Sequence, residues 1–276
     1  KNKYKLSKLK TLASTGSPLV QESFDYVYKS IKKNLHLASI SGGTDIVSCF
    51  VTGNPNMNVY SGEIQCAALG MDVDIFDQDG NSIKETKGEL VCKTPFPSKP
   101  IYFWNDKNNI KYLEAYFKTY NNIWHHGDYC EITKNNGYII YGRSDATLNA
   151  GGVRFGTAEL YRVVENIDKI IECVAVERNL YVDTEVILFL KLQPKYKLNE
   201  EFIKLIKSEI RSNLSPKHVP SKIFEVFDIP KTKSGKIVEL SIKNIINGLE
   251  IKNKNTLANP DCLKEYEHIY QKLNKE

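Results

Sequence analysis

The stretch Pro-Lys-Thr-Lys-Ser-Gly-Lys at residues 230–236 places three lysines beside a glycine and a serine. This segment is too polar for a core, and its glycine makes a stable helix unfavourable. One interpretation is a solvated surface turn. The other is a mobile loop that delivers a lysine ammonium to an anionic reaction centre, where fixed positive charge stabilises the charge that develops in the transition state.

A second group of polar residues flanks a strand–turn–strand pattern, with His-Gly-Asp at 126–128 and Gly-Arg-Ser-Asp at 142–145. Gly127 would let the backbone pass close to a ligand. The Asp128 carboxylate can accept hydrogen bonds from two vicinal hydroxyls, as on a ribose, and the planar Arg143 guanidinium suits phosphate or ribose oxygens. An acidic strand end and a surface arginine would look the same, so both interpretations stay open.

Two glycine-containing segments could bind anions. In Ser-Ile-Ser-Gly-Gly-Thr-Asp-Ile (39–46), Thr44 offers a hydroxyl and Asp45 a carboxylate, a pair that can serve a phosphate and its Mg²⁺. In the segment 148–160, a Gly-Gly pair precedes Arg154, and the next residues open a predicted helix whose N-terminus favours anions. Taken alone, each segment is explained as well by a turn or a helix cap.

Composition restricts the class of protein that carries these groups. The chain has 276 residues, of which 41% are hydrophobic and 26% charged, as in soluble globular proteins with one large or two modest domains. The net charge of +5 suits a small polyanionic ligand, and no basic stripe interleaved with aromatic residues argues for nucleic acid. No apolar run approaches the length of about 18 residues that predicts a membrane span.

The six cysteines form no Cys-Xaa-Xaa-Cys pair, which disfavours a zinc knuckle or a disulfide scaffold and favours reduced thiols in a cytoplasmic protein. His125 and His126 are adjacent and should point apart on a strand, so a metal site there is not expected. The first residue is Lys rather than Met, and no signal-peptide apolar stretch follows it, so we expect a fragment or a processed chain.

The elements that must position these residues fall into two regions. Residues 1–144 read mainly as short strands and turns, with helices predicted at 22–34 and 105–120 and a hairpin from 123–132 to 138–142. Residues 145–276 alternate helices and strands, which predicts a compact α+β unit. Its helices are predicted at 157–167, at 199–214 with Asn199 as N-cap, and at 238–247 as the last one, and its strands at 170–177, 184–192 and 221–229.

In this order the motifs resemble those of the adenylate-forming superfamily of acyl-CoA synthetases, peptide-synthetase adenylation domains and luciferases. The series is Gly-Asp at 127–128, Tyr-Xaa-Xaa-Xaa-Gly-Arg-Xaa-Asp at 138–145 and Pro-Lys-Thr-Xaa-Ser-Gly-Lys at 230–236. The stretches 40–50, 123–165 and 247–263 are similar to one branch, the acetoacetyl-CoA synthetases. The resemblance implies mixed α/β and α+β folds, with residues 1–144 as the end of a large ATP- and acyl-binding domain and 145–276 as a small mobile catalytic domain with its tail.

The resemblance also implies an ATP-dependent acid–CoA ligase that converts acetoacetate, ATP and CoA into acetoacetyl-CoA, AMP and diphosphate through an acyl-adenylate, with Mg²⁺. In the first region the matching positions are those that contact nucleotide and metal. They are Gly16, Ser17 and Pro18 at the adenine, Thr44 at the α-phosphate with a catalytic role, Asp45 at Mg²⁺, and Asp128 with Arg143 at the ribose.

In the second region the resemblance implies four further roles. Asp145 matches the hinge about which the small domain rotates, and Arg154 matches an arginine that contacts phosphate in the adenylation state. Gly152 lies on the loop that lines the CoA channel. Lys236 matches the catalytic lysine of adenylation, which favours the mobile-loop interpretation of residues 230–236. Lys231 and Lys233 are expected only to raise the local positive potential.

One expected part is missing from the sequence. The superfamily carries a Ser/Thr/Gly-rich phosphate loop that ends in Pro-Lys, and the similar-looking segment 14–18 has no lysine after it. We therefore expect roughly the last 40% of a synthetase, with a missing amino-terminal portion as partner, and poor adenylation by this chain alone. A catalytically silent remnant or a nucleotide-binding module remains an alternative.

A second alternative is a fragment of an acetyl- or propionyl-CoA synthetase. Those enzymes usually have Trp-Trp-Gln where this chain has Ile-Ser-Gly-Gly at 40–43. Glycine in place of indole should widen an acyl pocket, which favours acetoacetate. Ala150 stands where the acetoacetyl-CoA branch more often has a larger residue, so contacts on the CoA side could differ.

Overall fold

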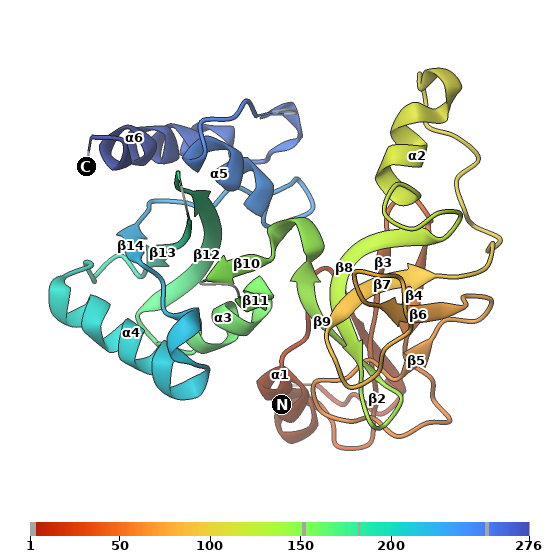
Figure 1. Cartoon of the computed structure of the whole chain (residues 1–276). Helices are drawn as coiled ribbons and strands as arrows, with labels where there is room; N and C mark the ends of the chain where they lie inside the picture. The colour runs from red at the N-terminus through yellow and green to blue at the C-terminus, as the bar shows by residue number, and fades with distance from the viewer. Residues whose placement is uncertain (1–3, 151–152, 182, 252–253, 276) are drawn as a thin grey trace. The chain divides into compact units, whose positions relative to one another are not determined.

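The computed structural model of the chain describes residues 4–150, 153–181, 183–251 and 254–275 (Figure 1). The chain forms two compact units, Lys1–Ser144 and Asp145–Glu276, which are described one at a time. Within the described residues, no helix combines the length and the apolar character that crossing a membrane requires.

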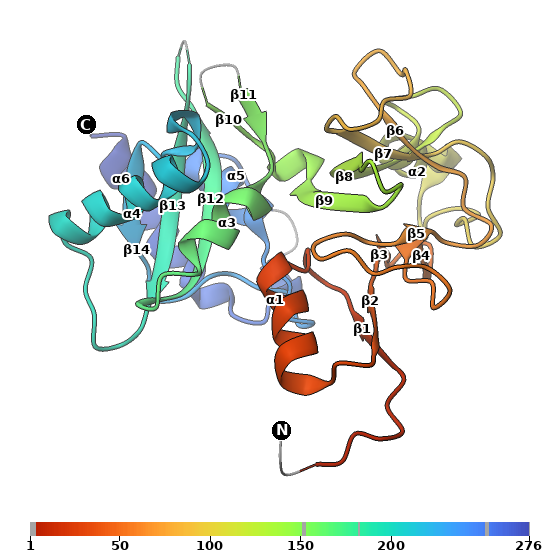
Figure 2. The ribbon, with the colours of Figure 1, turned by 90° about the horizontal axis from the view of Figure 1, so that it is seen from below.

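The first unit begins with a strand–helix–strand motif, and Figure 2 shows the helix next to the two strands. β1 (Thr11–Ser14) and β2 (His36–Ser39) pair in parallel, so the chain must cross over between them. α1 (Gln21–Tyr26) and a π-helical turn (Val27–Ile31) make that crossover, in place of the single helix predicted at 22–34. Their apolar residues pack with β2 in a small core of Phe24, Val27, Leu35 and Leu37.

Antiparallel strands make up most of the first unit. β3 (Ser41–Gly43), β4 (Ser48–Thr52) and β5 (Cys66–Ala67) form one sheet in that order. β6 (Val73–Phe76), β7 (Gly88–Cys92), β8 (Trp124–Ile132) and β9 (Tyr138–Arg143) form a second, also in chain order. The predicted hairpin is confirmed, because β8 and β9 pair directly.

The helix predicted at 105–120 is shorter than expected. It is α2 (Ile110–Tyr116), preceded by a 3₁₀ turn at Lys107–Asn109. Asn108 and Asn109 adopt the left-handed region, with φ of 60° and 56°, which interrupts helical geometry before Ile110. α2 places Tyr112 and Tyr116 against Trp124 of β8, so the helix is held by aromatic packing.

The second unit is built on a sheet of three strands. β12 (Ile170–Asn179) pairs antiparallel with β13 (Thr184–Leu192), and β14 (Lys222–Glu225) pairs parallel with β13. Before them, β10 (Leu148–Ala150) and β11 (Val153–Phe155) form a short hairpin. The helices are α3 (Thr157–Val164), α4 (Glu200–Asn213), α5 (Glu239–Ile246) and α6 (Leu263–Leu273).

Helices cover both faces of this sheet, because successive side chains of β12 point to opposite faces and both sets are apolar. Cys173 and Ala175 belong to a core that includes α3 and α4, whereas Val174 and Val176 belong to one that includes α5 and α6. Figure 1 shows the two helix pairs on opposite sides of β12. This arrangement confirms the mixed α+β fold that the helix and strand pattern predicts.

The sequence predicted the start of α4 correctly but missed α6. The Asn199 side chain accepts a hydrogen bond from Phe202 N at 2.8 Å, so the predicted N-cap of α4 is confirmed. The prediction that the helix at 238–247 is the last one is wrong, because α6 follows it. α6 buries Leu263, Tyr266, Ile269 and Leu273, a helical spacing that was readable in the sequence.

Candidate active site

Asp128 is the centre of a buried polar cluster in the first unit. It is 7% exposed and lies on β8 directly opposite Arg143 of β9. Its Oδ1 is 3.4 Å from Arg143 Nη1, and its Oδ2 accepts from the Ser41 hydroxyl at 3.3 Å. The Arg143 side chain is about half exposed, at 49%. The hairpin thus holds a buried carboxylate beside a partly exposed arginine, an arrangement suited to a polar, anionic ligand.

Gly127 has a role that the sequence did not predict. Its φ is +79°, and a Cβ there would lie 2.8 Å from Arg143 Nη2. Arg143 Nη1 also donates to the His126 carbonyl at 3.1 Å. The close neighbour of this backbone is therefore the Arg143 side chain, and the approach of a ligand to Gly127 stays a prediction. Any other residue at 127 would displace the guanidinium.

Gly16, Ser17 and Pro18 follow the carboxyl end of β1, where ligands bind in open α/β sheets. All three are exposed, and Gly16 has a φ of +99° that favours glycine. Ser14 O accepts from Ile40 N at 2.9 Å, and the next residue, Ser41, donates to Asp128. The end of β1, which this turn follows, therefore lies beside the residue that precedes Ser41, the partner of Asp128.

Thr44 and Asp45 lie exposed in the turn between β3 and β4. The Tyr116 hydroxyl of α2 donates to Asp45 Oδ2, and its ring stacks on Trp124 with centroids 3.7 Å apart. Burial, and then Asp45, raise the pKa of Tyr116, so the phenol stays protonated and donates. A hydroxyl and a single carboxylate fit Mg²⁺, which keeps most of its ligands as water and phosphate oxygens.

The lysine-rich segment of the second unit is a short hairpin. Thr232 N donates to Lys236 O at 2.8 Å, and Gly235 N donates to Thr232 O at 2.9 Å. Gly235, with a φ of +86°, makes the tip. The Lys236 side chain is exposed, and no described residue forms a hydrogen bond or ion pair with its ammonium. The backbone that carries this ammonium is ordered, and the charge is available to an external anion.

Lys231 differs from Lys236. From the sequence, Lys231 and Lys233 are expected only to raise the local positive potential. Instead, Lys231 Nζ forms an ion pair with Glu172 Oε1 at 2.7 Å, with both side chains mostly buried. The expectation is wrong for Lys231, because its charge is largely neutralised by its partner on β12. Lys233 is exposed, and its expected role stays a prediction.

Comparison with known proteins decides the family. The acetoacetyl-coenzyme A synthetase of Rhizobium meliloti (strain 1021) is 52% identical over 258 residues, which are 94% of this chain and 40% of that protein. The acetoacetyl-CoA synthetase of Xenopus tropicalis is 46% identical over 97% of this chain and 40% of that protein. The chain belongs to the acetoacetyl-CoA synthetase family. It spans about 40% of the length of these relatives and corresponds to a carboxy-terminal portion.

Solved structures agree with this assignment. The acetoacetyl-CoA synthetase from Streptomyces lividans matches with a TM-score of 0.89 and 37% identity, over 97% of this chain and 41% of that one. The anthranilate CoA ligase AuaEII matches at 20% identity with a TM-score of 0.70, over 85% of this chain and 44% of that one, which shows the fold alone. No family model matches the sequence.

In this acetoacetyl-CoA synthetase portion, the glycines at 42 and 43 do not simply leave empty space. A Cβ on Gly42 would lie 2.3 Å from Cys49 Cα, and one on Gly43 would lie 2.8 Å from His126 Cε1. The neighbouring strand β4 and the imidazole ring fill the volume. The physical argument that glycine here widens an acyl pocket is therefore wrong as stated, because larger residues would first require β4 and His126 to move.

The remaining predicted residues of this synthetase portion lie at the start of the second unit. Asp145 is in a 3₁₀ turn, and its carbonyl accepts from Lys243 Nζ at 3.1 Å. Arg154 Nε donates to Thr147 Oγ1 at 3.0 Å. Gly152 lies outside the described residues. The predicted anion site at the start of α3 is partly taken, because Gly156 N already donates to Glu159 Oε1 at 3.0 Å.

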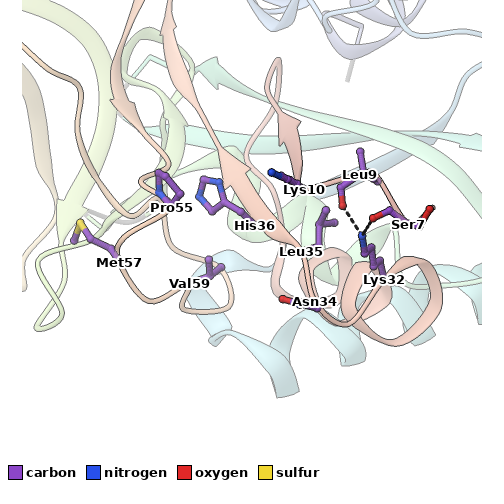
Figure 3. Close-up of a pocket in the computed structure, with 10 residues that line it drawn as sticks. All are labelled: Ser7, Leu9, Lys10, Lys32, Asn34, Leu35, His36, Pro55, Met57 and Val59. Carbon is purple, nitrogen blue, oxygen red and sulfur yellow. Dashed lines mark hydrogen bonds between the residues drawn. The ribbon is translucent and has the colours of Figure 1, made fainter.

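The first unit has an open pocket of about 460 Å³ whose lining side chains are drawn in Figure 3, and none of them is a residue that the family resemblance assigned. Lys32 Nζ at its wall donates to the carbonyls of Leu6, Ser7 and Leu9, and His36 Nε2 lies 2.8 Å from Gln65 Oε1. Lys32, just after the π-helical turn, thus ties down the segment that precedes β1, and His36 ties β2 to Gln65, next to β5. We interpret the pocket as a surface hollow and assign no part of the active site to it.

His126 gives this cluster a pH dependence. Its ring meets Phe50 edge-on with centroids 4.7 Å apart, and Asp128 Oδ2 is 3.8 Å from its Nε2. Burial lowers the pKa of His126, and the Asp128 charge opposes this effect only in part. In contrast, the neighbouring His125 lies 3.0 Å from Glu89 Oε2, so the two side chains have different surroundings, as expected on a strand.

We expect the first unit to lose stability as the pH falls below the unfolded-state value of 6.5 for histidine. The unfolded chain then binds a proton that the folded state resists, so the free energy of unfolding decreases. Both tryptophans, Trp104 and Trp124, lie in this unit, so urea unfolding followed by tryptophan fluorescence reports on it. His126→Gln should show a smaller decrease between pH 7.5 and 5.5 than the wild type or His268→Gln. Equal decreases in all three would contradict the assignment.

Proposed function

We propose that the chain is the carboxy-terminal portion of an ATP-dependent acid–CoA ligase that forms acetoacetyl-CoA, AMP and diphosphate from acetoacetate, ATP and CoA through an acyl-adenylate. The proposal depends on two features that both occur in this chain. Asp128, a buried carboxylate, lies 3.4 Å from Arg143 in one unit, and in the other the Lys236 ammonium, just after a hairpin tip, has no partner among the described residues.

The two units have different roles in this proposal. Residues 1–144 end the large domain that binds ATP and the acid, with the turn at Gly16, Ser17 and Pro18 at the adenine and Asp128 at the ribose. Thr44 and Asp45 would hold the α-phosphate and its Mg²⁺, which supplies charge neutralisation at the phosphates when bound. The exposure of Thr44 and Asp45 in one turn, with Asp45 oriented by the Tyr116 hydroxyl, supports this assignment.

Residues 145–276 form the small catalytic domain and its tail. Carboxylate attack on the α-phosphate brings two anions together, and the Lys236 ammonium offsets their repulsion and stabilises the developing charge. The ammonium must then leave so that the CoA thiol can approach. Rotation about Asp145 would move it and would bring Arg154 and the loop of Gly152 into their respective states. A cytoplasmic location is also proposed, which the six unpaired thiols support.

Acetoacetate- and CoA-dependent AMP release tests the proposal. We expect little or no turnover by the purified 276-residue chain, since its sequence holds no phosphate loop, but weak binding of AMP or ATP. The polypeptide that includes the upstream coding sequence should turn over acetoacetate faster than acetate. Robust turnover by the 276-residue chain would contradict the inferred need for an upstream portion, and absence of turnover by both would contradict the ligase function.

A further inference from the structure

The tail of the chain returns to the base of the lysine hairpin. Ala258 N donates to Lys231 O at 2.8 Å, and Leu257 forms an antiparallel bridge with Thr232. Leu257 is itself buried in the core between the sheet and α5 and α6. The tail therefore adds a short strand-like edge to the segment that leads into Lys236, and this edge is anchored in the core of the second unit.

One side chain of the tail, Asn259, makes three polar contacts to this base. Its Oδ1 accepts from Lys231 N at 2.9 Å. Its Nδ2 donates to Ile229 O at 2.8 Å and to Asp228 Oδ2 at 2.5 Å. A carboxamide has two donor hydrogens and one acceptor oxygen, so both donors and the acceptor are engaged. Asn259 thereby ties together three positions of the segment just before the hairpin.

The same segment is held from the strands of the sheet. Asp228 Oδ1 pairs with Lys191 Nζ of β13 at 2.6 Å, and Lys231 pairs with Glu172 of β12. The Tyr266 hydroxyl of α6 donates to the Asp228 carbonyl at 3.0 Å. Residues 228–232 are thus fixed on both sides, whereas the tip from Lys233 to Lys236 is exposed.

We propose that Asn259 is a positioning residue for Lys236: it braces the base of the hairpin so that the ammonium is delivered at one place. The inference rests on the proposed role of Lys236 in adenylation. Asn259 touches no reacting atom, and it acts through the backbone of residues 229–231. Because catalysis depends steeply on geometry, a displacement of about 1 Å at the tip can cost up to about 100-fold in rate.

The first test uses the polypeptide that includes the upstream coding sequence. Asn259→Ala should lower acetoacetate-dependent pyrophosphate exchange by about 10- to 100-fold through kcat. Thioester formation from preformed acetoacetyl-adenylate should stay within about twofold, since Lys236 is not required there. Asn255→Ala, an exposed position on the same tail, is the matched control and should leave both half-reactions unchanged.

Rescue separates positioning from general destabilisation. Asn259→Asp places a second carboxylate against Asp228 where the carboxamide donates, so it should be as impaired as Asn259→Ala. Adding Asp228→Asn to Asn259→Asp puts a carboxamide at position 228 that can donate to the new carboxylate at position 259. The double variant should recover pyrophosphate exchange at least about fivefold over Asn259→Asp. No recovery, or an equal loss in both half-reactions, would overturn the proposal.

Amide hydrogen exchange on the 276-residue chain gives a readout that does not need activity. Asn259→Ala should speed exchange at Lys231, Thr232 and Lys236 relative to Asn255→Ala, while the amides of α4 exchange as before. Unchanged exchange at the hairpin would refute the brace. If Lys236→Ala abolishes adenylation and Asn259→Ala leaves it unchanged, the positioning role of Asn259 is refuted and the ligase function stands. If the wild type never adenylates, the ligase function fails, and amide hydrogen exchange at the hairpin alone decides whether Asn259 holds it in place.

Discussion

Replacing Lys236 with alanine lowers acetoacetate-dependent pyrophosphate exchange by about 100- to 1000-fold, and we expect this to be the largest single effect in the chain. The reason is electrostatic. The ammonium is exposed and unpartnered among the described residues, so no internal ion pair competes with a bound phosphate. Removing it leaves the repulsion between the acid and the α-phosphate uncompensated in the transition state.

Comparison of the two half-reactions checks this prediction. Thioester formation from preformed acyl-adenylate should change little in Lys236→Ala, because the charge that Lys236 offsets is no longer forming. Lys233→Ala is the matched control, since it removes an exposed lysine three residues away in the same hairpin. Equal losses in both half-reactions would remove Lys236 from its proposed role, and a loss in Lys233→Ala as large as in Lys236→Ala would point to a general effect of local potential.

The second large effect is expected at Asp128. Asp128→Asn keeps the size of the side chain but removes the charge that faces Arg143, Ser41 and His126. Hydrogen bonds to charged groups contribute about 1.5 to 3 kcal/mol, so ATP and AMP should bind about 10- to 100-fold more weakly. Unlike Lys236→Ala, this substitution should impair both half-reactions, because the ribose stays bound through both.

Titration calorimetry with AMP, together with urea unfolding followed by tryptophan fluorescence, tests Asp128→Asn. Unfolding must show that the variant is folded at the temperature of the binding experiment, because the carboxylate is buried. Asp79→Asn, at an exposed acidic position of the same unit, is the control and should bind as the wild type does. A folded Asp128→Asn variant with unchanged affinity for AMP would exclude Asp128 from the ribose site.

Elements with strong local signals were predictable. The strand 184–192 has the bounds that its β-branched and aromatic residues predict, and α4 starts at the N-cap Asn199. The β8–β9 hairpin followed from two strand-like runs around an Asn-Gly turn. Such patterns are decided by dihedral preferences and by contacts within a few residues, so they can be read from one sequence.

Other elements were misjudged where local signals conflict or were not weighed. α2 is interrupted by left-handed Asn108 and Asn109, whose side chains do not disturb the apolar spacing that predicted a longer helix. α6 was missed although its apolar spacing is helical. Lys231 looked equivalent to Lys233 in the sequence, and only the folded structure shows that Lys231 forms an ion pair with Glu172.

The sequence by itself offers the groups suited to the proposed chemistry, namely the carboxylate of Asp128, the guanidinium of Arg143 and the ammonium of Lys236, and the order of their motifs predicts the family that comparison with known proteins shows. Tertiary structure alone decided how they are held. Ser41 reaches Asp128 across 87 positions, and Asn259 reaches Lys231 across 28. Residue type and spacing report on neighbours along the chain, whereas burial and hydrogen-bond partners depend on which distant segments the folded core brings together.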